Sequence, residues 1–225
     1  MLALDGVDAD LARGELTAIM GPSGSGKSTL MRCLAGLDAP TSGTIMLNGQ
    51  EISAMSGRQL TRLRRTQMGF VRQSFNLIPT LTALENITLQ LDISRRPPDP
   101  AWLENLVEAL GLRSRLDHKP SALSLGQCQR VACARALVGR PSVVLADEPT
   151  GNLDSVESRY VLDFLRNSAD ALGQSIILAT HDSAVAARAH RVLFLNDGRI
   201  VGERRAPTHG AILDALRDLG NRDNA

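Results

Sequence analysis

The sequence predicts an α/β fold with a mostly parallel sheet, and two patterns support that prediction. Short runs rich in Val, Ile and Leu alternate with longer amphipathic segments, as in a sheet whose strands are joined by helices. The run Val143–Ala146 has no polar alternation, which is typical of a strand covered on both faces. The expected strands are Leu16–Met20, Thr44–Leu47, Met68–Val71, Val143–Ala146, Ser175–Ala179 and Arg191–Leu195.

The stretch from about residue 76 to residue 123 interrupts this alternation. It offers two helical patterns, Thr82–Leu91 and Ala101–Leu110, and a proline-rich loop, but no clear strand. We therefore expect a single domain over residues 1–225. Its core is expected at about 1–75 and 124–225, with an inserted α-helical subdomain at about 76–123, and the tail Pro207–Leu219 is expected to form a last helix.

Composition and charge exclude several classes of protein. The 225 residues carry 25 Lys and Arg against 24 Asp and Glu, so a net charge of +1 provides no global attraction to nucleic acid, and no nucleic-acid partner is expected. No stretch approaches the ~18 apolar residues of a membrane span, and the first residues lack the features of a signal peptide. A cytoplasmic chain with reduced, buried cysteines is expected; these are Cys33, Cys128 and Cys133.

The segment Gly21–Ser28 matches the phosphate-binding pattern Gly-x4-Gly-Lys-Ser/Thr and lies between an apolar strand and an apolar helix. Its glycines let backbone N–H groups wrap a polyphosphate, and the helix N-terminus adds partial positive charge. Lys27 is expected to neutralise the β- and γ-phosphates, Ser28 to ligate Mg²⁺, and Thr29 to reach the α-phosphate. The alternative, a chance glycine-rich turn, is disfavoured by the flanking strand and helix. The expected nucleotide contacts are Gly21, Pro22, Ser23, Gly24, Ser25, Gly26, Lys27, Ser28 and Thr29.

Two carboxylates, Asp147 and Glu148, follow the apolar run that begins at Val143. This places both acids at the carboxyl edge of the sheet, where the phosphate loop also lies. Asp147 is expected to hold Mg²⁺, and Glu148 to orient or deprotonate the water that attacks the γ-phosphate. The alternative is a helix-capping acid beside a solvated glutamate, and the nearby phosphate loop makes that alternative less favourable.

Four further positions fit the same active site by their order along the chain. Gln73 follows an expected strand, the segment Leu123–Gln127 opens a helix, Asp154 follows the two acids, and His181 follows the strand Ser175–Ala179. Each position is a weak signal alone, because such residues are more often surface or structural residues. Their order and spacing relative to the phosphate loop favour a functional interpretation.

Together these segments closely resemble the ABC ATPase pattern, and the resemblance covers nearly the whole chain. It implies a P-loop NTPase core of the RecA-like type and a head-to-tail dimer that holds two ATP molecules between its subunits. Residues Ser124, Gly126 and Gln127 of one subunit would face the γ-phosphate of ATP bound by Lys27 of the other. A helix that begins near this signature segment, Leu123–Gln127, would direct its N-terminal dipole at such an anion.

The resemblance also implies roles for three separate residues. His181 would contact the γ-phosphate, and Asp154 would communicate across the dimer. Gln73 would link Mg²⁺ and the attacking water to the helical subdomain, where family members meet membrane partners. The expected catalytic residues are therefore Glu148, His181 and Gln73, and the expected metal ligands are Ser28, Gln73 and Asp147.

Finer strings point to one subgroup and to a transport role. Gly36–Gly43, Gly69–Leu77 and Ala146–Asp154 look like the subgroup for lipoprotein release, macrolide and peptide export, and cell-division components. The expected protein is an ATP-hydrolysing subunit on the cytoplasmic face of the membrane, in a homodimer or heterodimer with separate integral-membrane permease subunits. The alternatives are a non-transport ATPase that regulates a membrane partner, as in cell division, or one that acts on nucleic acid or ribosomes. A small-molecule kinase would leave Gln73, the signature segment and His181 without roles.

Two features depart from the family pattern. Leu125 stands where the signature segment usually has its first glycine, so a bulky side chain is expected near the proposed phosphate contact. The family usually stacks an aromatic residue on adenine upstream of the phosphate loop, whereas every aromatic residue here lies at Phe70 or later. Weakened discrimination between ATP and GTP is therefore expected.

Overall fold

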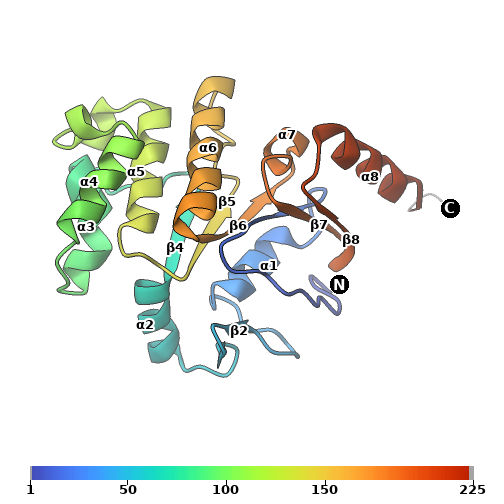
Figure 1. The fold of residues 1–225 in the computed structure, drawn as a ribbon. Coiled ribbons are helices and arrows are strands. Elements are labelled where there is room, and N and C mark those ends of the chain that lie inside the picture. Colours follow the sequence, from blue (N-terminus) through green and yellow to red (C-terminus); the bar gives the residue numbers. More distant parts are fainter. Residues whose placement is uncertain (1, 223–225) are drawn as a thin grey trace.

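The computed structural model describes residues 2–222 and shows a six-stranded sheet with helices on both faces (Figure 1). The strand order is β4-β5-β6-β1-β7-β8, in which the first five strands run parallel and β8 is antiparallel to β7. The expected α/β fold with a mostly parallel sheet is confirmed. The strands are β1 (Leu16–Met20), β4 (Met68–Arg72), β5 (Val143–Asp147), β6 (Ser175–Thr180), β7 (Arg191–Asn196) and β8 (Arg199–Arg205).

Helices from distant parts of the sequence cover the sheet. Apolar residues of α1 and α2 pack on one face of the sheet, and those of α5 and α6 pack on the other face. Helices α3 and α4 lie beside α5 at one end of the molecule, α8 lies at the other end, and α7 contacts β1, β6 and α8 (Figure 1). The helices are α1 (Lys27–Leu34), α2 (Gly57–Gln67), α3 (Ala83–Ile93), α4 (Pro100–Ala109), α5 (Leu125–Leu137), α6 (Ser155–Leu172), α7 (Ser183–Ala186) and α8 (His209–Arg222), with short 3-10 turns at Arg113–Arg115 and Pro120–Ala122.

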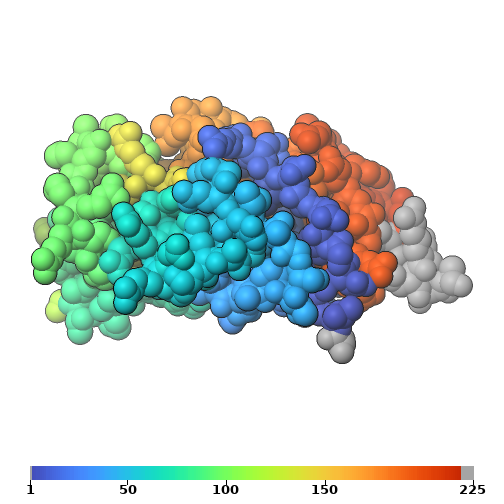
Figure 2. Space-filling model, turned by 90° about the horizontal axis from the view of Figure 1, so that it is seen from below, coloured from blue at the N-terminus to red at the C-terminus, as the bar shows by residue number. Residues whose placement is uncertain are grey.

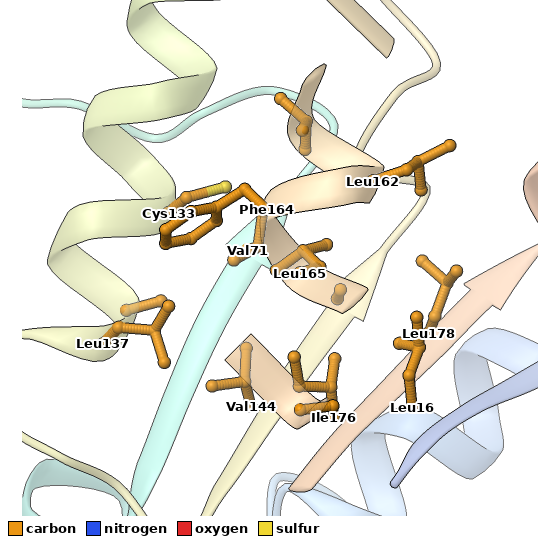
Figure 3. Packing of buried hydrophobic residues seen from close by; sticks show 14 of the residues in the cluster. Leu16, Val71, Cys133, Leu137, Val144, Leu162, Phe164, Leu165, Ile176 and Leu178 are labelled. Atoms are coloured by element: carbon orange, nitrogen blue, oxygen red, sulfur yellow. The ribbon is translucent and has the colours of Figure 1, made fainter. Parts of the chain in front are cut away.

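The central strands are buried on both faces, as the uninterrupted apolar runs predict. In β5, Val144 and Ala146 join the core formed with α5 and α6, whereas Val143 and Leu145 join the core formed with α1 and α2. Figure 3 shows the first of these cores, where Phe164 of α6 lies against the α5 and β4 side chains. Successive side chains of a strand point to opposite faces, so one strand supplies both cores.

Helices α3 and α4 lie between β4 and β5, where the sequence predicts two helices, and local signals explain where they begin. Thr82 and Glu85 form a reciprocal capping box at the start of α3. Asp99 caps α4 by accepting hydrogen bonds from two backbone N–H groups, and Pro100 occupies the first turn. Apolar residues of both helices pack into the same core as α5. Both expected helices are therefore confirmed to within two residues at each end.

The expected strand Thr44–Leu47 is wrong as a member of the main sheet. Only β2 (Met46–Leu47) is extended in a strand, and it pairs antiparallel with β3 (Gln50–Glu51) in a separate two-stranded hairpin. Asn48 and Gly49 form the turn with positive φ angles of 51° and 79°. An Asn-Gly pair favours such a tight hairpin, and this local preference ends β2 after two residues.

Strand β8 was not expected, although an Asp-Gly pair precedes it, much as the Asn-Gly pair precedes β3. Asp197 and Gly198 have positive φ angles of 45° and 74°, so they form a tight turn that reverses β7 into β8. The strand is mostly exposed and begins and ends with arginine, so it lacks the apolar alternation used to recognise strands. Charged side chains suit an edge strand, because they discourage pairing with another sheet.

The expected last helix and the expected state of the cysteines agree with the structure. Helix α8 includes most of the range Pro207–Leu219 and packs Ile212 and Ala215 into the main core. The three cysteines are free and buried, and burial raises the pKa of Cys133 to about 12. Among the helices of residues 2–222, none combines the length and apolar character needed to cross a bilayer.

Gly69 permits the close packing of α5 on β4, which generates a prediction about stability. A Cβ atom at Gly69 would overlap the carbonyl oxygen of Ala136 in α5. We expect Gly69→Ala to lower the free energy of unfolding by about 1–3 kcal/mol, because backbone must move to relieve the overlap. Gly57→Ala is the matched control, since a Cβ there meets no atom within 4 Å. Equal urea-unfolding midpoints for the two variants would contradict the prediction.

Candidate functional site

The loop between β1 and α1 is shaped by glycines at two kinds of position. Gly24 and Gly26 have φ angles of 83° and 103°, which side chains with a Cβ rarely adopt. Gly21 lies so close to β7 that a Cβ there would overlap the carbonyl oxygen of Leu195. Helix α1 then begins at Lys27 with no side-chain cap, so its first N–H groups face the loop. This is the backbone arrangement that binds phosphate groups.

Lys27 lies folded over this loop. Its Nζ donates hydrogen bonds to the carbonyl oxygens of Gly21 at 2.7 Å and Pro22 at 2.8 Å. Burial lowers the pKa of Lys27, and the nearby carboxylates of Glu148 and Asp147 partly oppose that effect. The ammonium group is therefore held between the loop and the two acids, where a polyphosphate would replace its carbonyl contacts.

The loop, the two acids and the strand-end histidine line one cavity of about 870 Å³. This volume lies within the range of small-molecule binding sites. The cavity brings together residues expected at three separate places in the sequence. Its lining residues are Ala3, Pro22, Ser23, Gly24, Gly26, Lys27, Ser28, Thr29, Asp147, Glu148 and His181. Of the expected loop residues, Gly21 and Ser25 lie behind this surface.

The register of the parallel strands explains this convergence. Met20 of β1 pairs with Thr180 of β6, and Asp147 of β5 pairs with Ala179 of β6. The carboxyl ends of β1, β5 and β6 therefore stop at the same edge of the sheet. Each strand delivers its next residues to that edge, which is where ligands bind in open α/β sheets.

Asp147 has the surroundings of a cation ligand. Burial raises its pKa, and the adjacent Glu148 carboxylate adds to that shift, whereas Arg72 and Lys27 lower it. A bound cation would offset both unfavourable effects. The Ser28 hydroxyl and the Asp147 carboxylate line the same cavity and are oxygen ligands of the kind that Mg²⁺ prefers. Within residues 2–222 no group of three or more His, Cys, Asp or Glu side chains is placed to hold a metal ion.

Glu148 is held in place by the end of β6. Its Oε1 accepts a hydrogen bond from the backbone N–H of His181 at 3.0 Å and lies 2.6 Å from His181 Nδ1. The buried Thr180 hydroxyl donates to Oε2 at 3.1 Å and accepts from the N–H of Asp182. Glu148 also has a positive φ of 45°, an uncommon backbone state for a residue with a side chain. The carboxylate is thus fixed at the cavity wall by three contacts.

Gln73 does not line the cavity, although it lies next to it. Its backbone N–H donates to the carbonyl oxygen of Asp147 at 3.1 Å. Its side chain is linked to Asn152, because Gln73 Nε2 donates to Asn152 Oδ1 at 3.2 Å and Asn152 Nδ2 donates to the Gln73 carbonyl at 3.0 Å. Because Asn152 must use its Nδ2 to donate to the Gln73 carbonyl, its Oδ1 is the atom that faces the Gln73 side chain. Oδ1 can only accept, so it binds the nitrogen of the Gln73 side-chain amide, and the oxygen of that amide is left for other partners.

The signature segment and Asp154 lie outside the cavity. Ser124 and Gln127 cap α5 reciprocally, with hydrogen bonds of 3.2 Å and 2.9 Å between side chain and backbone. Asp154 caps α6 by accepting from the N–H groups of Val156 and Glu157, both at 2.9 Å. Leu125 is 59% exposed and is not among the residues that line the cavity of its own chain.

Three residues that shape the site were not among the predicted site residues. Thr180 and Asn152 hold Glu148 and Gln73, respectively, and neither type of contact leaves a pattern in the sequence. Ala3 lines the cavity because the first residues cross the phosphate loop, where Asp5 N–H donates to the Gly198 carbonyl at 2.8 Å. No Phe, Tyr or Trp is among the residues that line this cavity.

Comparison with known proteins gives one family. The model of the family described as ABC transporter matches residues 4–151. The lipoprotein-releasing system ATP-binding protein LolD of Shewanella frigidimarina is 43% identical over 197 residues, which are 87% of this chain and 82% of that protein. The macrolide export ATP-binding/permease protein MacB of Burkholderia pseudomallei is 45% identical over 224 residues. The match covers 97% of this chain but only 33% of MacB.

A solved structure supports the same comparison. The dimeric, post-hydrolysis state of the ATP-binding cassette MJ0796, bound to ADP and phosphate, superposes with a TM-score of 0.81 at 38% sequence identity. The superposition covers 91% of each chain. The similarity therefore covers the fold of nearly the whole chain.

The raised pKa of Asp147 predicts how the stability of the nucleotide-free chain depends on pH. A carboxyl whose pKa is higher in the folded than in the unfolded chain opposes folding when it is ionised. This effect is absent below the unfolded pKa of about 4 and is complete above the folded pKa. We expect Asp147→Asn to increase the free energy of unfolding by about 0.5–2 kcal/mol at neutral pH, and the gain to vanish near pH ~4.

Urea unfolding without nucleotide or Mg²⁺ would measure this difference between pH ~4 and pH ~8. Asp163→Asn is the control, since Asp163 is ion-paired with Arg188 on the exposed side of α6 and lies outside the cavity. A lower stability of Asp147→Asn at neutral pH would show that the folded chain stabilises this carboxylate rather than opposing it.

Proposed function

Because the chain belongs to the ABC transporter family as an ATP-binding subunit, we propose that it hydrolyses ATP to drive transport through separate membrane-spanning subunits. One observation carries the proposal: the phosphate loop, Asp147 and Glu148 face a single cavity at the carboxyl edge of the sheet. A phosphate-binding loop opposite a metal-binding acid and a general base is the arrangement that phosphoryl transfer to water needs.

The loop and Lys27 would bind the polyphosphate of ATP. Backbone N–H groups at the start of α1 donate to phosphate oxygens, and the Lys27 ammonium neutralises the β- and γ-phosphates. Ser28 and Asp147 would hold Mg²⁺, with Gln73 contributing its amide oxygen and Thr29 contacting the α-phosphate. The bound cation would supply charge neutralisation at the β- and γ-phosphates. Its presence would also stabilise the ionised form of Asp147.

Glu148 would act as the general base. Its carboxylate accepts a proton from a water molecule as the water oxygen attacks the γ-phosphorus, and the bond to the β-phosphate oxygen breaks to release ADP and inorganic phosphate. His181 and Thr180 hold this carboxylate at the cavity wall, which fixes its direction before ATP binds. His181, whose side chain is 71% exposed, would also contact the γ-phosphate.

We also propose that the site is completed by a second ATPase subunit. Ser124, Gly126 and Gln127 lie outside the cavity of their own chain, at the N-terminus of the 13-residue helix α5. In a head-to-tail dimer this helix end would face the γ-phosphate of ATP bound to the other subunit. Asp154 would lie near the same interface and communicate between the two sites. The MJ0796 cassette, which is dimeric with ADP and phosphate bound, supports this arrangement.

The helical insertion would connect this ATPase to its membrane partner. We propose the division into a core at about 1–75 and 124–225 and a helical subdomain at about 76–123. Gln73 immediately precedes that subdomain, and its link to Asn152 joins it to the segment after Glu148. Closure of the dimer would thus move the helical subdomain together with the catalytic segment. A permease docked there would place the chain on the cytoplasmic face of the membrane.

The catalytic assignment predicts the behaviour of Glu148→Gln. The amide cannot accept a proton from water, so hydrolysis of Mg²⁺-ATP should fall at least about a hundredfold, a typical loss for a general base. The variant should still bind ATP, and in the presence of ATP it should accumulate as a dimer that light scattering detects. The wild-type chain with and without ATP is the comparison. Undiminished hydrolysis by Glu148→Gln would exclude Glu148 as the base.

The transport assignment predicts a membrane-bound partner. Purification of the tagged chain from detergent-solubilised membranes should recover a multi-span permease in a stable complex. Lys27→Ala should recover the same permease, because the proposed docking surface lies on the helical subdomain and not in the cavity. Recovery of ribosomes or nucleic acid instead would support the non-transport alternative.

A further inference from the structure

A carboxylate lies directly beneath the signature segment. Gly126 is buried, and a Cβ at this position would overlap the side chain of Glu157, which belongs to the first turn of α6. A larger residue at position 126 would therefore have to displace the Glu157 side chain. The Oε2 atom of Glu157 is buried and makes no hydrogen bond. A negative group with one unsatisfied oxygen thus lies against the segment proposed to bind a phosphate.

Arg130, one turn further along α5, offsets this charge incompletely. Its Nη2 lies 3.6 Å from Glu157 Oε1, which is longer than a normal hydrogen bond, and its Nε is buried without a partner. The guanidinium is fixed elsewhere: Nη1 donates to the Leu110 carbonyl at 3.2 Å, and the group lies 5.1 Å from the centre of the Tyr160 ring. Arg130 therefore cannot move freely to neutralise Glu157.

The pair is shielded from water enough for its charges to act at a distance. The Arg130 and Glu157 side chains are 15% and 29% exposed, respectively. Charges at such partly buried positions are screened less by salt than charges on the surface. A phosphate anion that binds at the α5 N-terminus would meet both groups, repelled by one and attracted by the other.

We propose that Glu157 and Arg130 form a charge pair that sets how strongly the signature segment holds the γ-phosphate of ATP bound to a second copy of the chain. Glu157 weakens the ATP-dependent dimer, and Arg130 opposes that effect. The pair thereby limits the lifetime of the closed state. This inference rests on the shared site proposed above and adds two residues that tune it without contacting the cavity of their own chain.

The net charge of the pair should determine how readily ATP forms the dimer in four proteins: the unsubstituted chain, the two single variants and the double variant. Glu157→Gln removes the negative charge and keeps the shape, so the ATP concentration for half-maximal dimer should fall about three- to tenfold. Arg130→Met keeps much of the aliphatic stem and should raise that concentration by a similar factor. The double variant restores zero net charge and should lie close to the unsubstituted pair.

Light scattering against ATP concentration, in the Glu148→Gln background that prevents turnover, measures this order. Asp163→Asn is the matched control, because it removes one negative charge from the same helix and pairs with Arg188 instead. This variant should leave the ATP concentration for half-maximal dimer unchanged. Thermal unfolding of each variant without ATP identifies any loss of folding.

Two results would overturn the inference. If Arg130→Met and the double variant weaken the dimer equally, Arg130 acts only by holding α4, α5 and α6 together. If Glu157→Gln and Asp163→Asn give the same ATP dependence, the charge at position 157 has no specific effect. A failure of the shared site itself is distinguishable, because the Glu148→Gln parent would then form no dimer at any ATP concentration.

Discussion

The parallel pairing of β1, β5 and β6 is the constraint on which the site depends. It stops three strands at one edge of the sheet, so the residues that follow each strand meet although the loop after β1 lies more than a hundred positions from those after β5 and β6. The pairing is possible because both faces of these strands are covered, by α1 and α2 on one side and α5 and α6 on the other. Figure 2 shows the molecule from the side of α2, where the segment that contains the β2–β3 hairpin and α2 lies across the middle of the view.

Close backbone approach is the second recurring device. Gly21 lets the phosphate loop rest on β7, Gly69 lets α5 rest on β4, and Gly126 lets α5 rest on Glu157. At Gly21 and Gly69 a single methyl group would overlap backbone atoms, whereas at Gly126 it would displace the Glu157 side chain. These contacts therefore affect both the packing of the core and the geometry of the nucleotide cavity and the signature segment.

The residues expected at the site fall into two sets with different physical situations. Lys27, Asp147 and Glu148 line one cavity and influence each other's charge, so they form a unit within one chain. The signature segment and Asp154 instead cap helices in their own chain and face outward. In the proposed dimer, joining these two sets into one phosphate site would require a second subunit. The Arg130–Glu157 pair lies under the outward-facing set, where it can influence that joining.

The sequence alone determined the sheet, the helices between β4 and β5 and the nucleotide loop, because each leaves a local pattern: apolar runs, helical periodicity and glycines at fixed spacing. It also placed Asp147, Glu148 and His181 at the correct edge, since strand ends in a parallel sheet converge. It failed at the Asn48-Gly49 hairpin, where a tight turn outweighed the apolar pattern, and at β8, which has no apolar alternation. Only the tertiary structure decided that Thr180 holds Glu148, that Asn152 holds Gln73 and that Glu157 lies beneath Gly126. These contacts join residues distant in sequence and depend on how α5, α6 and the strands pack, which no local pattern records.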